Sequence, residues 1–304
     1  MTDKIEEITE IEIDDEDELA VKLKIKVPPI KSQGKKTKLV PWIKDNYDAL
    51  HKNQDTLYVE PFVGTGVVGF NLSPEKALFT DINPHLINFY NGLKYKKFDH
   101  KDVREFLERE GALLSIHGVE HYKEIRSRFN DFADPLDFLF LSRSCFNGMM
   151  RFNKKGGFNV PFCKKPDRFA KAYITKIVNE VKWLEFKLNT NDWKFETADF
   201  KDVLKRIEDN ENVIVYSDGP YPSRYNDYFN GWSDTDERAL FTSLDKIQGQ
   251  FILSTWFGNE FRENTFITEL WSKFEIVTKD HTYHLGAKIE NRNEIKEALV
   301  IKRN

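Results

Sequence analysis

The feature that most constrains the fold is a strand, a glycine-rich turn, a helix and a second strand, which follow one another within residues 57–83. A short apolar run leads into EPFVGTG, where Gly64 and Gly66 permit a tight turn before an apolar helix start. A second apolar run then ends at Asp81 and Asn83. This order is typical of the first half of a dinucleotide-type α/β sheet, in which an acid at the second strand end binds ribose hydroxyls.

The same turn narrows the class of cofactor. It lacks the third glycine of the GxGxxG pattern and the Lys-Ser/Thr pair of a P-loop, which serve pyrophosphate and ATP phosphates. A cofactor that has a ribose and no pyrophosphate fits this turn better than NAD or ATP. The glycine turn and the acid that follows it therefore predict S-adenosylmethionine.

A third apolar run, VIVY, leads directly into Asp218, Gly219, Pro220 and Tyr221. As a buried strand it would deliver these four residues to the carboxyl edge of the sheet, where ligands bind in such folds. A carboxylate, a backbone carbonyl and an aromatic ring suit a planar substrate with an exocyclic amine, because two acceptors take the amine hydrogens while the ring stacks. The alternative is an ordinary turn at a strand end, in which Tyr221 only packs.

The charges are unevenly distributed along the chain. Residues 1–20 hold ten acidic residues and one lysine, so the net charge of −4 for the whole chain leaves +5 for the remainder. Residues 143–176 hold nine Lys or Arg against Asp167 alone, a net charge of +8. A cationic stretch of this density indicates a surface that binds a polyanion.

Within that stretch, residues 142–162 mix Arg, Lys, Asn and Phe in a glycine-rich loop. Cations suit phosphates, Arg and Asn suit base edges, and Phe suits wedging or stacking, so the loop predicts contact with nucleic acid. The alternative is a solvated cationic loop that its phenylalanines anchor.

Composition argues against several other classes of protein. No apolar run approaches the length of a membrane span, and the first residues are too acidic for a signal peptide, so we expect a cytoplasmic protein without a membrane partner. Cys145 and Cys163 lack the spacing of a zinc site or a disulfide framework. We therefore expect no metal.

Together these segments resemble the Dam-like family of adenine-specific DNA methyltransferases, which transfer a methyl group from S-adenosylmethionine to N6 of adenine. The resemblance runs from about Pro29 to Val300 in the order cofactor segment, target-recognition insertion and catalytic tetrad. It implies an α/β fold, a Rossmann-like methyltransferase sheet with helices on both faces and an inserted target-recognition subdomain. The expected units are an acidic tail (1–27), a catalytic domain (28–100 and 190–304) and a recognition insertion (101–189).

The resemblance also implies roles for individual residues. In the family, the segment that reads KSQGKK here lies against the cofactor, Glu60 suits its ammonium, and Asp199 and Phe200 match the pair that holds its adenine. The expected cofactor-binding residues are Lys31, Gly34, Lys36, Glu60, Phe62, Gly64, Gly66, Asp81, Asn83, Asp199 and Phe200. The expected DNA-binding residues are Arg143, Phe146, Asn147, Arg151, Lys154, Lys155 and Asn159, with Asn147 and Arg151 as the readers of bases.

The catalytic tetrad departs from the family pattern. The family has Asp-Pro-Pro-Tyr, whereas this chain has Asp218, Gly219, Pro220 and Tyr221, which are the expected catalytic residues. Glycine keeps the carbonyl that accepts from the target amine but loses the ring that fixes φ.

We therefore expect a site-specific methyltransferase that acts on adenine in double-stranded DNA, with a separately acting restriction endonuclease as a candidate partner. One alternative is a catalytically weakened or inactive relative that still binds DNA. Another is methylation of RNA or protein by the same half-fold, which would leave the cationic loop unexplained.

Overall fold

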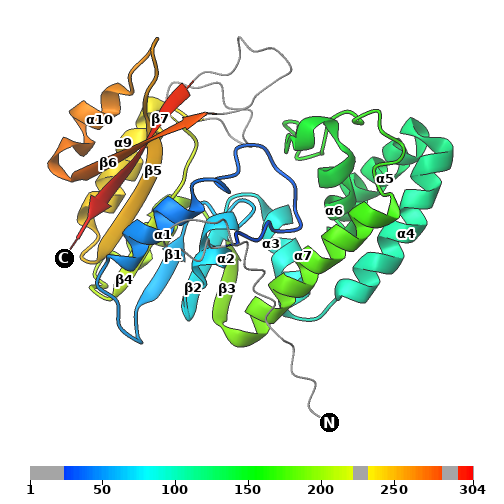
Figure 1. Ribbon diagram of the computed structural model, residues 1–304, viewed down its shortest axis with the longest axis horizontal. Helices are drawn as coiled ribbons and strands as arrows, with labels where there is room; N and C mark the ends of the chain where they lie inside the picture. Colours follow the sequence, from blue (N-terminus) through cyan, green and yellow to red (C-terminus); the bar gives the residue numbers. More distant parts are fainter. Residues whose placement is uncertain (1–23, 222–231, 283–293, 304) are drawn as a thin grey trace, which may run out of the picture.

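The computed structural model describes residues 24–221, 232–282 and 294–303, so residues 1–23 of the expected acidic tail lie outside the described residues. A seven-stranded sheet in the order β3-β2-β1-β4-β5-β7-β6 forms the centre of the chain (Figure 1). β7 runs antiparallel to β5 and β6, whereas β1, β2, β3, β4 and β5 pair in parallel. The strands are β1 (Leu57–Glu60), β2 (Lys76–Asp81), β3 (Asp192–Thr197), β4 (Val213–Ser217), β5 (Gln250–Gly258), β6 (Glu275–Thr282) and β7 (Glu294–Lys302).

Helices cover both faces of this sheet, so its central strand β4 is buried along its whole length. All five residues of β4 are buried, and alternate side chains point to opposite faces. Ile214 and Tyr216 join the core that packs against α1, α2 and α3, whereas Val213 and Val215 join the core under α8, α9 and α10. These helices are α1 (Val40–Asp48), α2 (Val67–Leu72), α3 (Pro84–Lys94), α8 (Phe200–Arg206), α9 (Asp234–Lys246) and α10 (Thr265–Glu269), and the 3-10 turn η2 (Trp271–Lys273) follows α10.

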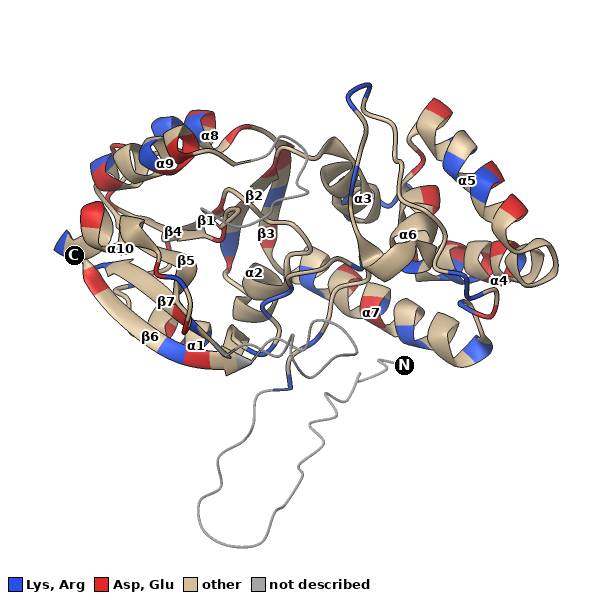
Figure 2. Cartoon of the chain, turned by 90° about the horizontal axis from the view of Figure 1, so that it is seen from above, with Lys and Arg blue, Asp and Glu red and all other residues tan. Residues whose placement is uncertain are grey.

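A group of helices lies beyond the β3 edge of the sheet, at the end opposite β6 and β7 (Figure 1). Asp99 and Asp134 cap the first and third of them by accepting backbone N–H bonds, which satisfies donors that a helix start leaves unpaired. Lys, Arg, Asp and Glu alternate along the helices of this group (Figure 2). The elements are α4 (His100–His117), α5 (Val119–Phe132), α6 (Pro135–Ser144), the 3-10 turn η1 (Phe146–Gly148) and α7 (Lys171–Thr190).

Contacts to two buried carboxylates hold these helices to one another. Arg128 of α5 binds Asp137 of α6 through N–O contacts of 2.8 and 2.5 Å. His121 of α5 lies 2.8 Å from Glu110 of α4. Three helices are thus cross-linked through the buried carboxylates of Glu110 and Asp137, whereas Arg128 is 43% exposed, and these contacts join the helices from which the following loop projects.

The strand order creates a switch point between β1 and β4. From β1 the chain continues outward to β2, whereas from β4 it continues to β5 on the other side. Ligands of doubly wound sheets bind at the carboxyl ends of strands at such a point. The predicted α/β sheet with helices on both faces is confirmed, whereas β6 was not anticipated. No helix in the described part of the chain is long and apolar enough to cross a bilayer.

Candidate active site

The glycine turn after β1 is joined to the end of β2 by one carboxylate. Asp81 accepts 2.9 Å hydrogen bonds from the backbone nitrogens of Gly64 and Asn83, one on each oxygen. Burial raises the pKa of Asp81 to about 6, against the opposing effect of these backbone hydrogen bonds. The carboxylate predicted from the sequence therefore lies against the turn, as a ribose-binding role requires.

The two glycines of this turn serve different purposes. Both have left-handed backbone angles, with φ of +50° at Gly64 and +71° at Gly66. A Cβ on Gly66 would lie 2.3 Å from the ring of Phe70, so packing excludes a side chain there. A Cβ on Gly64 would meet nothing within 4 Å, which leaves open space beside Asp81 that a ligand can use.

Glu60 ends β1 as a buried carboxylate. Its Oε2 accepts a 3.0 Å hydrogen bond from the hydroxyl of Tyr58, and the residue is only 2% exposed. Burial raises the pKa of Glu60 well above its usual range, and the nearby charge of Asp218 adds to this shift. A cationic ligand group would favour the ionised form of Glu60 and so bind well here.

Three aromatic rings form a cluster beside the turn. The centroid of Phe62 lies 5.3 Å from that of Phe200 and 5.7 Å from that of Trp232, and Phe200 and Trp232 are 5.6 Å apart. Asp199, directly before Phe200, caps α8 by accepting from the nitrogen of Lys201 at 2.8 Å. The cluster offers aromatic surface for a planar base beside the glycine turn.

A network of four side chains lies beyond the end of β4. The Nζ of Lys36 is 3.3 Å from Oδ1 of Asp218, donates to the hydroxyl of Tyr221, and lies 4.3 Å from the centroid of that ring. The hydroxyl of Tyr221 in turn donates to Oε2 of Glu297 at 2.6 Å. Lys36 is also 3.9 Å from Glu297, so one ammonium lies between two carboxylates.

The electrostatics of Asp218 follow from this network. Burial raises the pKa of Asp218, Lys36 opposes that shift, and the negative charge of Glu297 adds to it. The Asp218 side chain remains 20% exposed, so a substrate can reach it. The residue is thus an accessible carboxylate in a partly desolvated site, where a hydrogen bond to an amine is stronger than in water.

The backbone conformation at position 219 does not require glycine. Its φ lies outside the left-handed region, and a Cβ there would lie 3.4 Å from the ring of Phe62 and 3.6 Å from Trp232, which are ordinary contacts. A Cβ is therefore accommodated at this position.

The segment that contains residues 31–36 divides between two places. The ammonium of Lys36 contacts Asp218, whereas the Lys31 side chain approaches Gly148 at the start of the 142–162 recognition loop. The backbone nitrogen of Lys31 donates to Oγ of Ser142 at 3.4 Å, and a Cβ on Gly148 would lie 3.0 Å from the Lys31 side chain. Gly34, between them, has a φ of +73°, so it provides the turn that this path needs.

The predicted recognition loop contains a short hairpin. Phe152 and Phe158 pair across it, and the side chain of Asn153 accepts from the backbone nitrogens of Lys155 and Gly157 at its tip. Lys154 and Lys155 are exposed at that tip.

Before the hairpin, Phe146 is 49% exposed, and Asn147 has a left-handed φ of +54°. Nε of Arg151 donates to Oδ1 of Asn159 at 2.9 Å. The structure therefore presents an exposed aromatic ring, two lysines and an Arg-Asn pair on one loop.

Arg143 stands apart from the other predicted DNA-binding residues. It forms an ion pair with Glu180 of α7, its Nε donates to the carbonyl of Pro29 at 2.6 Å, and its side chain is only 12% exposed. These contacts tie α6 to α7 and to the chain segment before Lys31. The geometry therefore favours a structural role for Arg143.

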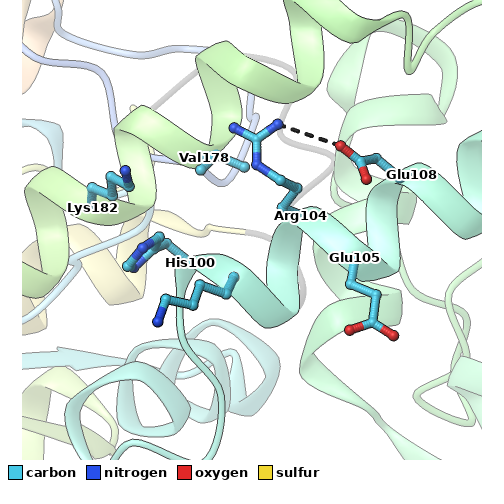
Figure 3. A pocket seen from close by; sticks show the side chains of 7 residues that line it. His100, Arg104, Glu105, Glu108, Val178 and Lys182 are labelled. Atoms are coloured by element: carbon cyan, nitrogen blue, oxygen red, sulfur yellow. Dashed lines mark hydrogen bonds and ion pairs between the residues drawn. The ribbon is translucent and has the colours of Figure 1, made fainter.

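A pocket lies on the helical group, away from all of these residues. In Figure 3 its lining side chains come from α4 and α7, and an ion pair joins Arg104 to Glu108 across it. None of the residues predicted from the sequence lines it. Within 24–221, 232–282 and 294–303, no cluster of three or more His, Cys, Asp or Glu is arranged to hold a metal ion.

Glu297 was missed by the sequence reasoning. It directly precedes the buried apolar run 298–301 of β7, and its only local signal is a charged residue beside that run. The sequence also predicts a loop near the target base that contains Tyr225, Asp227, Tyr228, Phe229 and Trp232, with core packing as the alternative for its aromatic residues. Trp232 lies in the ring cluster described above, whereas the other four lie outside the described residues.

Comparison with protein families is consistent with this geometry. A family model described as D12 class N6 adenine-specific DNA methyltransferase matches residues 32–285, most of the chain.

Individual relatives are similar over most of this chain. A DNA adenine methylase of Vibrio cholerae is 31% identical over 255 residues, which cover 80% of this chain and 86% of that protein. The type II methyltransferase M1.LlaDCHI of Lactococcus lactis is 28% identical over 301 residues, which cover 93% and 98%. The type II methyltransferase M.FokI of Planomicrobium okeanokoites is 28% identical over 288 residues, which cover 90% of this chain and 42% of that larger protein.

Proposed function

This chain belongs to the D12 class of N6 adenine-specific DNA methyltransferases, and we propose that it transfers a methyl group from S-adenosylmethionine to N6 of adenine in duplex DNA. The observation that carries the proposal is the position of Asp218 and Tyr221. They lie at the carboxyl end of β4, next to the strand whose glycine turn contacts Asp81. A cofactor site and an amine-binding site therefore adjoin at the switch point of the sheet.

The residues around the turn suit S-adenosylmethionine. When bound, this cofactor supplies a methyl group on a positively charged sulfur. Asp81 would bind the ribose hydroxyls, Glu60 would favour the ammonium of the methionine part, and the open space beside Gly64 would admit the ligand close to the backbone. Phe62 and Phe200 would hold the adenine ring of the cofactor.

The tetrad would hold the target adenine after it leaves the duplex. Asp218 would accept one hydrogen of the N6 amine, and the carbonyl of Gly219 would accept the other. The ring of Tyr221 would stack on the base. Such an arrangement orients the amine, and orientation alone can lower the barrier of a transfer by several kcal/mol.

DNA binding would fall to the recognition loop. Lys154 and Lys155 would contact phosphates, Arg151 and Asn147 would read base edges, and the exposed ring of Phe146 would enter the base stack. The names of two relatives as type II methyltransferases support a further proposal, that a separate endonuclease recognises the same DNA site.

The test is transfer of labelled methyl from S-adenosylmethionine to mixed-sequence duplex DNA, followed by digestion to nucleosides. We expect N6-methyladenine as the product. Asp218→Asn should lower the rate by about 100-fold, because one oriented acceptor for the reacting amine is replaced by an amide. Asp209→Asn is the matched control, since Asp209 is exposed in the loop before β4.

Other outcomes would contradict the proposal. If the chain binds S-adenosylmethionine and duplex DNA but transfers nothing, the binding-only alternative holds. Transfer to single-stranded RNA in preference to duplex DNA would point to an RNA substrate. Equal rates for the two aspartate variants would exclude the assigned role of Asp218.

A further inference from the structure

Glu297 is a buried carboxylate that the sequence pattern did not bring into the site. It lies in β7, in register with Trp256 of β5 and Lys279 of β6, and its side chain is 1% exposed. A buried charge in the middle of a sheet is costly unless its partners compensate it. Its partners here are Tyr221 and Lys36, both of which contact the catalytic tetrad or belong to it.

We propose that Glu297 is a positioning residue for methyl transfer, which holds the Tyr221 ring against the target adenine and holds Lys36 between two carboxylates. This inference rests on the proposed function of the tetrad. It adds a residue from the far side of the sheet to a site that the sequence places on β1, β2 and β4.

The first part of the argument concerns Tyr221. This residue lies past the end of β4, outside any helix or strand, so no backbone ladder fixes its ring. Its hydroxyl donates to Glu297 at 2.6 Å, a length typical of a charge-assisted hydrogen bond. Because β7 is bonded to strands on both sides, Glu297 provides a rigid anchor for the Tyr221 hydroxyl.

The second part concerns Lys36. Its ammonium is 3.3 Å from Asp218 and 3.9 Å from Glu297, and it also donates to the Tyr221 hydroxyl. One cation is thus shared by two carboxylates and does not pair with Asp218 alone. The sharing leaves acceptor capacity on Asp218 for the amine of the base, because a carboxylate has two oxygens and several lone pairs.

These contacts predict which variants lose activity. Glu297→Ala removes the anchor of Tyr221, and we expect kcat to fall by about 10- to 100-fold, since a displacement of about 1 Å can cost that much. Glu297→Gln keeps an acceptor for Tyr221 but removes the charge, so its loss should be about 10-fold or less. The affinity for S-adenosylmethionine should be unchanged in both variants.

A structural role for Glu297 would produce a different pattern. A double-mutant cycle with Tyr221→Phe separates the two cases, because the phenylalanine variant already lacks the hydroxyl that Glu297 binds. If Glu297 acts through Tyr221, adding Glu297→Ala to Tyr221→Phe should change kcat by less than about threefold. If Glu297 only stabilises the sheet, the loss should be as large in the double variant as in the single one.

The pH profile provides a second readout. The charged groups that face Asp218 are Lys36, Glu297 and Glu60. The charge of Glu297 raises the pKa of Asp218, so Glu297→Gln should move the acid limb of the kcat profile to lower pH. Glu275→Gln is the matched control, because Glu275 is in the neighbouring strand β6, is paired with Arg303 and does not contact Tyr221.

The experiment is single-turnover methyl transfer to duplex DNA by the full chain and these variants, with cofactor binding measured separately by calorimetry. No transfer by the unaltered chain would mean that the proposed function has failed. An active unaltered chain with Glu297→Ala equal to Glu275→Gln would overturn the role of Glu297 alone. If Glu297→Ala does not fold, the double-mutant cycle of Glu297→Gln with Tyr221→Phe is used instead. The proposal would be refuted if Glu297→Gln left the low-pH part of the kcat profile unchanged and the effects of the two substitutions on kcat were fully additive.

Discussion

Replacing Gly219 by proline tests how far the tetrad depends on a fixed backbone. The position accepts a side chain, because a Cβ there would make only ordinary contacts with Phe62 and Trp232, at 3.4 and 3.6 Å. Its φ lies outside the left-handed region, and the following residue, Pro220, already disfavours a helical conformation. A proline at 219 should therefore be accommodated without rearrangement.

The magnitudes follow from the conformational freedom that proline removes. A compatible substitution by proline stabilises a protein by about 0.4–1 kcal/mol through the unfolded chain. For a chain of 304 residues that corresponds to a rise in Tm of about 0.6–1.6 °C. Fixing the backbone of one residue costs about 1–2 kcal/mol of conformational free energy. Pro220 already restricts residue 219 in part, so we expect proline at 219 to raise kcat by about 2- to 10-fold.

The assay is single-turnover methyl transfer at saturating cofactor and DNA, with Tm from calorimetry, for the unaltered chain, Gly219→Pro and Gly219→Ala. Alanine adds the same Cβ without fixing φ, so it separates packing from restriction of the backbone. A fall in both kcat and Tm for proline, with alanine neutral, would refute the reasoning. It would show that the site needs the N–H of Gly219 or a φ that proline does not adopt.

Three further predictions concern the cofactor, the DNA surface and the helical group. Burial raises the pKa of Asp81 to about 6, so its carboxylate becomes protonated as the pH falls through that value. Calorimetry should therefore show that the affinity for the cofactor decreases below about pH 6. An affinity that does not change between about pH 5 and 8 would contradict this prediction. The same raised pKa means that the folded chain holds this proton more tightly than the unfolded chain, so the contribution of Asp81 to stability falls as the pH rises from about 4 to 6. Replacing Lys154 and Lys155 by alanine should reduce the slope of log affinity for DNA against log salt concentration by about 1.8. An unchanged slope would show that neither lysine contacts a DNA phosphate. Arg143→Ala removes the arginine that pairs with the buried Glu180, so it should lower the free energy of unfolding by about 3–5 kcal/mol, as measured by urea titration. Weaker DNA binding with unchanged stability would instead show that Arg143 contacts DNA.

Sequence reasoning worked best where the signal is local. The glycine turn, the acid at the end of β2 and the apolar strand before Asp218 all lie within short segments, and the structure places them at one sheet edge. Apolar runs and turn residues predict such units because the pattern that defines each of them lies within a few consecutive residues. The strand β6 was missed because its alternating residues, EIVTKDHT, are mostly polar and gain a partner only from β7.

The contacts around the tetrad could not be predicted from the sequence. Lys36 is expected at the cofactor, but its 3.3 Å contact with Asp218 was not predicted, and Glu297 was not expected in the site at all. Arg143 has the same side chain as Arg151 and lies in the same cationic stretch, yet one is buried against Glu180 and the other lies on the loop beside Asn159. Residue type and spacing do not distinguish these two environments.

The sequence by itself therefore determined the α/β sheet, the family to which the chain belongs and the strand ends at which its polar residues lie. Only the tertiary structure decided which of those residues meet. Lys36 and Tyr221 are 185 positions apart, and Tyr221 and Glu297 are 76 apart, so their contacts exist only after the 24–39 segment and β7 pack around the end of β4. Burial and pairing of charges depend on that packing, because the cost of removing a charge from water is set by its surroundings in space and not by its neighbours along the chain.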